Sequence, residues 1–155
     1  MEHILLEARD TLSVDPDHVR QWFKELDAHP ERYQFDTHAG FVFTSGTFGQ
    51  IGSHFRTRER FHGLPVTLQF ELTEIDEDRF TFRLTRPALP VWGAFLIQRA
   101  ADNTTVLSLV VGESARQAAW FLRLPLIRAA VHRQIRGEIA HIKSSIENSF
   151  SPPEP

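Results

Sequence analysis

The sequence predicts an α+β fold in which one antiparallel sheet packs against one long helix. Five segments alternate apolar and polar side chains with a period of two, which is the pattern of β-strands buried on one face, and two further segments are apolar on both faces. Two short helical segments separate the first strand from the second, and a long segment with isoleucines at helical spacing closes the chain. Consecutive strands with the helices set apart from them are typical of the α+β class.

Size and composition predict a single domain. The chain has 155 residues, of which 41% are apolar, and its 13 Phe supply large side chains for one core. We expect the domain to span residues 1–149 and the Pro-rich residues 150–155 to form a disordered tail. Because the chain has no Cys, disulfide-stapled scaffolds, thiolate zinc sites and Cys nucleophiles are excluded.

The N-terminal sequence predicts a cytoplasmic protein, and the charge distribution predicts one that does not bind nucleic acid. Glu2, Glu7 and Asp10 interrupt the first ten residues, which lack the apolar run of a signal peptide, and no segment has the composition of a bilayer span. The net charge is −3. Although the second half of the chain is basic, its Arg and Lys residues are spread singly, which favours a solvated surface over a nucleic-acid face.

The first strand is predicted over residues 4–14, with Asp10 interrupting its apolar face. Asp15 and Pro16 then form a helix start, because Asp caps free backbone N–H groups and Pro fits the first helical turn. Pro30 starts a second helical turn. The apolar positions between these two starts have the spacing of one helix face: Val19, Trp22, Phe23 and Leu26.

The second and third strands are predicted to form a hairpin around the glycine-spaced segment 46–52. Alternation runs over residues 35–43 and 55–61, and a common apolar face fixes the register. The pairs expected in this register are Phe41 with Phe55, Phe43 with Ser53, and Thr37 with Glu59.

Four further strands are predicted over residues 66–72, 80–84, 91–100 and 105–113. A two-residue turn at Gly63 and Leu64 would place Glu59 opposite Leu68, and the next strand would place Arg86 on the other side of Leu68. Glu59 and Arg86 would then lie about 10 Å apart at the backbone, with side chains on one face. The last two strands are apolar on both faces, as expected for central strands or for strands at a partner surface.

The closing helix is predicted from Pro125 to Asn148, a length of about 36 Å. A helix of this length can cross a whole sheet. Its apolar stripe consists of Ile127, Val131, Ile135, Ile139, Ile142 and Ile146.

Four motifs carry a family resemblance: the Asp15–Pro16 opening of a Trp22-bearing helix, the His29–Pro30 break before Tyr33, the loop 46–52, and the final Ile139–Lys143 segment. With this element order, the chain resembles the START and birch-pollen-allergen (SRPBCC) superfamily, in particular its small bacterial polyketide cyclase/dehydrase and lipid-transport members. The resemblance implies a helix-grip: a bent seven-stranded antiparallel sheet wrapped around the C-terminal helix. It also implies an apolar cavity for a lipid, sterol, quinone, polyketide or hormone. None of these motifs is catalytic, so they are specific for fold.

The predicted registers select the side chains that would line such a cavity. The apolar candidates for ligand binding are Phe41, Phe55, Leu68, Phe70, Phe82, Val131 and Ile135. The polar candidates are Glu59 and Arg86, with Asp10 in support. They would anchor a ligand carbonyl or carboxylate, or act as acid and base, or form a structural ion pair at the end of the sheet. Gln98 or Glu113 is a further inward candidate.

Several motifs of catalytic and cofactor sites are missing from the sequence. It contains no HExxH motif and no G-x-S-x-G elbow, and the glycine loop lacks the Lys of a phosphate-binding loop. We therefore expect no metal and no cofactor.

An apolar patch precedes the closing helix. Trp120 and Phe121 lie close to Arg123 and would either touch a membrane or a partner protein at the lip of the cavity, or pack as an ordinary helix entrance.

The leading functional hypothesis is a binding or carrier protein for a hydrophobic small molecule. It depends on the Phe-rich inner faces and the missing catalytic motifs. The alternatives are a cyclase/dehydratase-type enzyme acting on an aromatic or polyketide substrate through Glu59 and Arg86, and a protein-interaction module.

Overall fold

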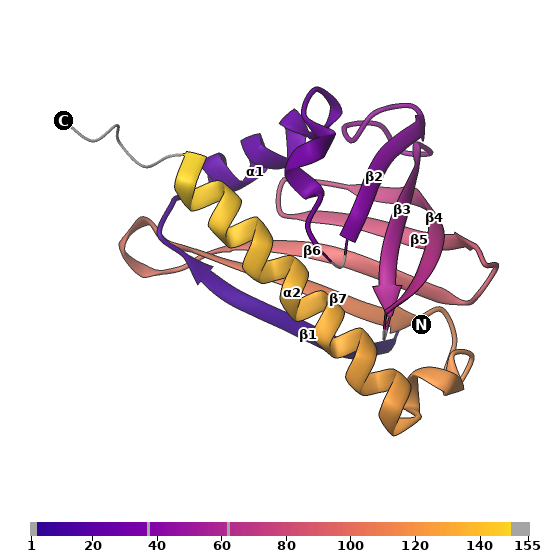
Figure 1. The fold of residues 1–155 in the computed structure, drawn as a ribbon. Helices are drawn as coiled ribbons and strands as arrows, with labels where there is room; N and C mark the ends of the chain where they lie inside the picture. Colours follow the sequence, from indigo (N-terminus) through magenta and orange to yellow (C-terminus); the bar gives the residue numbers. More distant parts are fainter. Residues whose placement is uncertain (1–2, 37, 62, 150–155) are drawn as a thin grey trace.

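The computed structural model describes residues 3–36, 38–61 and 63–149, in which seven antiparallel strands form one sheet with a long helix across it (Figure 1). The strands are β1 (His3–Leu12), β2 (His38–Ser45), β3 (His54–Phe61), β4 (Leu64–Ile75), β5 (Arg79–Arg86), β6 (Val91–Arg99) and β7 (Thr105–Glu113). Their spatial order is β1-β7-β6-β5-β4-β3-β2. The α+β prediction is confirmed, whereas the predicted tail 150–155 lies outside the described residues.

The helices are α1 (Pro16–Lys24) and α2 (Pro125–Ser149), with short 3-10 turns η1 (Glu25–Asp27), η2 (Pro30–Tyr33), η3 (Ala101–Asn103) and η4 (Trp120–Arg123). Figure 1 shows α2 running diagonally across the sheet beside β1 and β7, which it contacts. The predicted stripe of α2 is buried from Ile135 onward, whereas Ile127 at its start is exposed. No helix in the described part of the chain combines the length and apolar character needed to cross a membrane.

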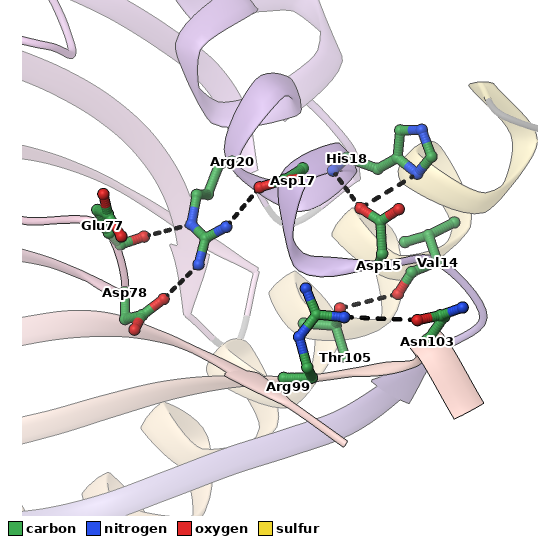
Figure 2. Close-up of polar contacts among 10 residues, drawn as sticks. All are labelled: Val14, Asp15, Asp17, His18, Arg20, Glu77, Asp78, Arg99, Asn103 and Thr105. Atoms are coloured by element: carbon green, nitrogen blue, oxygen red, sulfur yellow. Dashed lines mark hydrogen bonds and ion pairs between the residues drawn. The ribbon is translucent and has the colours of Figure 1, made fainter. Parts of the chain in front are cut away.

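The start of α1 follows its sequence signals. The Asp15 carboxylate accepts a hydrogen bond from the backbone N–H of His18, and Pro16 occupies the first turn. The Arg20 side chain donates hydrogen bonds to the Glu77 carbonyl and to the Asp78 carboxylate, which fastens α1 to the turn between β4 and β5 (Figure 2). This contact holds α1 over one end of the sheet.

The predicted register of the hairpin β2–β3 is wrong by two residues. Phe41 pairs with Thr57 and Phe43 with Phe55, and the predicted partner of Glu59, Thr37, lies outside the described residues. The shift preserves which face each side chain occupies, because strand residues alternate with a period of two. The observed register differs from the predicted one because β2 is irregular near both ends, between His38 and Gly40 and between Phe43 and Ser45.

The loop between β2 and β3 folds onto the core. Gly46 has a φ of 73°, and a Cβ there would lie 2.1 Å from the Ser53 Oγ, so glycine is required. Phe48 is buried and its ring lies 5.5 Å from that of Phe23 and 4.8 Å from that of Phe80. The Asp27 carboxylate accepts a hydrogen bond from the Phe48 N–H. The loop therefore closes one end of the space between sheet and helix.

Candidate functional site

A cavity of about 590 Å³ lies between the sheet and α2. Its wall is mainly apolar and includes residues that the sequence selected: Phe41, Phe55, Leu68, Phe70, Phe82, Val131 and Ile135. Gly93 of β6 also lines it, and a Cβ there would lie 2.5 Å from the Phe82 ring. Glycine thus leaves room for this ring to lie flat against the sheet.

One end of the cavity reaches the surface. Leu89 from the β5–β6 connection and Leu126 and Ile127 from the start of α2 line the cavity and are exposed, Leu126 by 80%. Nearby on η4, Trp120 is 62% exposed. Apolar side chains therefore surround the opening.

The opposite end of the cavity carries a cluster of polar side chains from four elements. Tyr33 ends η2, His38 begins β2, Glu59 lies in β3 and Glu138 lies in the middle of α2. The Tyr33 hydroxyl donates a hydrogen bond to Glu138 Oε2 at 2.5 Å, and Thr57 Oγ1 donates one to Glu59 Oε1 at 3.0 Å. His38 Nε2 lies 3.8 Å from Glu59 Oε1. These side chains form the polar end of the cavity.

The sequence identified only Glu59 in this cluster. His38 belongs to the outward face under strict alternation, but the irregularity between His38 and Gly40 turns it inward, opposite Glu59. The sequence holds no sign of this bulge. Glu138 did carry a signal, since it lies three residues after Ile135 and four before Ile142, on the apolar stripe of α2. An acidic residue on an otherwise apolar helix face indicates a buried polar group and therefore a candidate functional site.

Burial controls the ionisation of the cluster. Glu59 is 6% exposed, and burial, helped by the charge of Glu138, raises its pKa to about 8. Burial likewise raises the pKa of Glu138 to about 7, against hydrogen bonds from Tyr33 and Gln134 that lower it. Burial lowers the pKa of His38 to about 4. The cluster thus contains a neutral imidazole and two carboxyl groups that exchange protons near neutral pH.

The tautomer of His38 follows from its contacts. Its Nδ1 lies 2.6 Å from the Tyr33 carbonyl oxygen, which can only accept a hydrogen bond, so Nδ1 carries the proton. The Nε2 atom therefore presents a lone pair on the side of Glu59. The imidazole acts as a hydrogen-bond acceptor toward this part of the cavity.

These groups are also the candidate metal ligands of the described residues. One ligand atom each of His38, Glu59 and Glu138 lie within 4.8 Å of one another. Bonds of about 2.1 Å to zinc in tetrahedral geometry place ligand atoms roughly 3.4 Å apart. The side chains would have to move together to hold such an ion, so the expectation of no metal site stays a prediction.

Arg86 does not join Glu59. Glu59 pairs with Val66 rather than with Leu68, and Arg86 pairs with Gln69. A register shift between Gln69 and Phe70 places Arg86 at an exposed position outside the cavity lining. The predicted meeting of Glu59 and Arg86 over Leu68 is therefore wrong, because a bulge reverses the face of the last residue of β5.

Comparison with known proteins identifies the fold. No protein-family model and no curated protein sequence matches the chain. Among solved structures, the ZhuI aromatase/cyclase from Streptomyces sp. R1128 is similar with a TM-score of 0.75 and 13% identity over 97% of both chains. The chain has the helix-grip fold.

Two further helix-grip structures are similar at low identity. Ara h 8.0201 has a TM-score of 0.65 at 16% identity and covers 96% of this chain and 99% of its own. A norcoclaurine synthase from Thalictrum flavum, a point mutant in complex with a transition-state analogue, has a TM-score of 0.68 at 7% identity, over 97% of this chain and 98% of its own. The resemblance to this superfamily is confirmed at the level of the fold.

The remaining polar candidates lie outside the lining of the helix-grip cavity. Asp10 is exposed and pairs with Lys143 Nζ at 3.4 Å, and Gln98 is exposed near the end of β6. Glu113 is buried, but its carboxylate accepts hydrogen bonds from the Ala119 N–H and from the Arg123 guanidinium. Arg123 holds the pKa of Glu113 down to about 2, so this ion pair fastens the connection between β7 and α2.

The side chains of the apolar patch before α2 differ in their burial. Leu122 is buried as part of the helix entrance and Phe121 lines the helix-grip cavity, whereas Trp120 is exposed. The predicted contact of Trp120, Phe121 and Arg123 with a membrane or a protein stays a prediction.

Proposed function

We propose that the protein binds or carries a hydrophobic small molecule, such as a lipid, quinone or polyketide, in this cavity, and that it does so in the cytoplasm. The observation that carries the proposal is a space of about 590 Å³ with an apolar wall and polar groups gathered at one end. Binding sites for small molecules commonly have about 300–1,000 Å³ and this distribution of polarity. A core that served stability alone would fill the space, because unfilled volume forfeits packing contacts.

The layout also suggests how the ligand lies. Leu126 at the opening and Glu138 in the polar cluster belong to the same helix, about 18 Å apart at 1.5 Å per residue. A ligand with an elongated apolar body and one polar end fits this arrangement, with the polar end beside Glu59 and Glu138 and the body along the phenyl rings.

Fluorescence titration with the neutral probe N-phenyl-1-naphthylamine tests the proposal. Val131 lines the cavity, so we expect Val131→Trp to fill it and to reduce probe affinity at least about tenfold. Val42 is 40% exposed on β2 and provides the matched control, because Val42→Trp adds the same ring away from the cavity. Equal binding by the wild type and both variants would place the probe elsewhere, and no binding by the wild type would refute the proposal.

A second candidate function is a cyclase/dehydratase-type enzyme acting on an aromatic or polyketide substrate in the same cavity. The observation that favours it is the pair of buried carboxyls, Glu59 and Glu138, with pKa values raised to about 8 and about 7. General acid–base catalysis is efficient when both protonation states are accessible at the working pH. Under this hypothesis Glu59→Gln keeps substrate binding and abolishes turnover, whereas under the carrier hypothesis it changes only the affinity for polar ligands.

A further inference from the structure

Among the described residues, the cavity lining contains acidic side chains and no side chain that is positively charged at neutral pH. In the segments that the structure describes, the ionisable lining side chains are Tyr33, His38, Glu59 and Glu138, and the lining contains no Lys or Arg. Burial keeps His38 neutral and raises the pKa of Tyr33 well above 10, so neither is charged at neutral pH. A ligand carboxylate at this end would meet no positive charge and two acidic groups. Such a buried anion is strongly unfavourable.

The acceptor atoms of the polar cluster lie close enough together for one cation to bind several of them. One ligand atom each of Glu59, Glu138 and His38 lie within 4.8 Å of one another, and His38 Nε2 lies 3.8 Å from Glu59 Oε1. An ammonium nitrogen donates along tetrahedral directions with N···O distances of about 2.8–2.9 Å, so two of its acceptors lie about 4.6–4.7 Å apart. Acceptors within 4.8 Å of one another are therefore close enough together for one ammonium nitrogen to bind more than one of them.

The carboxyl groups are held in this arrangement by neighbours on separate elements. The Tyr33 hydroxyl binds one oxygen of Glu138 and the Thr57 hydroxyl binds one oxygen of Glu59. The hydroxyl protons of Tyr33 and Thr57 are thus already engaged. Glu138 also accepts a hydrogen bond from Gln134, and since an ionised carboxylate offers about four acceptor sites, both groups keep acceptor sites for a ligand. His38 adds an Nε2 acceptor on the same side.

We propose that the ligand is a hydrophobic amine, bound as its ammonium ion between Glu59 and Glu138 with its apolar body along the phenyl rings. This proposal rests on the proposed function, since it requires the cavity to bind a hydrophobic small molecule.

Binding of an ammonium ion changes the protonation of Glu59 and Glu138. Burial favours the protonated form of both Glu59 and Glu138 when no cation is bound. When the ammonium ion binds, carboxyl protons leave to the solvent and the carboxylates pair with the ligand charge. Of the groups facing them, Tyr33 from η2 and His38 from β2 do not change charge between about pH 6 and 8, and Gln134 from α2 does not titrate. Amine affinity therefore rises over this range.

Three probes with one ring skeleton test the proposal by isothermal titration calorimetry: 1-naphthylmethylamine, 1-naphthalenemethanol and 1-naphthoate. At about pH 7.5 we expect the amine to bind about tenfold tighter than the alcohol and the carboxylate about tenfold weaker than the alcohol. The amine should release protons on binding, seen as a dependence of the heat on the buffer, whereas the alcohol should release none.

Substitutions of Glu59 and Glu138 test whether these two side chains cause the preference for the amine over the alcohol. Glu59→Gln and Glu138→Gln should each bring the affinities for amine and alcohol within about threefold of one another, because each removes one acidic group that would pair with the ammonium ion. Glu7 is exposed on β1, so Glu7→Gln is the matched control and should keep the preference. An amine that binds no tighter than the alcohol, or a preference that survives in both cavity variants, overturns the proposal while leaving the cavity a ligand site. Failure of all three probes to bind the wild type overturns the proposed function as well.

Discussion

The buried carboxyl groups predict that the protein becomes less stable as the pH rises through neutrality. Glu59 has an ordinary pKa of 4.5 and a folded-state pKa raised to about 8. The folded state therefore holds this proton more tightly than the unfolded state does. The resulting stabilisation is fully present below pH 4.5 and is lost as the pH rises from there to about 8.

The effect of the carboxyl groups is best measured in the pH range above the titration of His38. The pKa of His38 falls from 6.5 to about 4 on folding, so its effect on stability has the opposite sign and is confined to lower pH. From pH 6.5 upward the carboxyls dominate. Glu59 loses about 2 kcal/mol of stabilisation between pH 6.5 and its pKa of about 8, and Glu138, whose pKa is about 7, loses under about 1 kcal/mol.

Urea denaturation of the wild type and Glu59→Gln across this window measures the effect. Gln has the shape of a protonated Glu, so we expect the variant to lie within about 1 kcal/mol of the wild type at pH 6.5 and to gain about 2 kcal/mol relative to it by about pH 8.5. Glu7→Gln, an exposed substitution on β1, should follow the wild type at every pH. A wild-type curve parallel to that of Glu59→Gln would refute the assignment of a raised pKa to Glu59.

Side-chain packing and exposure determine the expected effects of further substitutions. Trp22→Ala, at a fully buried position outside the cavity lining, should reduce the free energy of unfolding by about 3–5 kcal/mol, whereas Phe70→Ala, at a partly buried cavity wall, should cost under about 2 kcal/mol; equal losses in chemical denaturation would mean that Phe70 is packed core. Glu113→Gln should lower Tm and speed hydrogen exchange of the amides at 117 and 119. Unchanged exchange there would contradict the stabilisation of the β7–α2 connection by the Glu113 carboxylate. If the exposed Trp120 touches membranes, vesicles of anionic phospholipid should shift the tryptophan emission of the wild type to shorter wavelength but not that of Trp120→Phe, and an equal shift in both would assign the contact elsewhere.

The sequence predicted the fold because its signals are local and periodic. The cap at Asp15, the break at Pro30 and the isoleucine stripe of α2 each depend on residues within a few positions of one another. Strand faces were predictable in the same way, since Glu59 and Phe55 do point inward.

The site was less predictable because bulges and long-range packing determine it. A bulge reverses the faces of the residues on one side of it relative to those on the other. One bulge places His38 in the cavity and a second one places Arg86 outside it. The contact between Tyr33 and Glu138 joins residues far apart in the chain, which alternation cannot detect. Of the missed residues, only Glu138 carried a periodic signal.

Native mass spectrometry of the full chain, purified without detergent, tests most directly whether the cavity holds a small molecule. We predict a species heavier than the 17.8 kDa chain by one small apolar molecule, or by one N-phenyl-1-naphthylamine after incubation with that probe, and its loss in Val131→Trp but not in Val42→Trp. A wild-type protein that remains at the mass of the bare chain under both conditions would contradict the account.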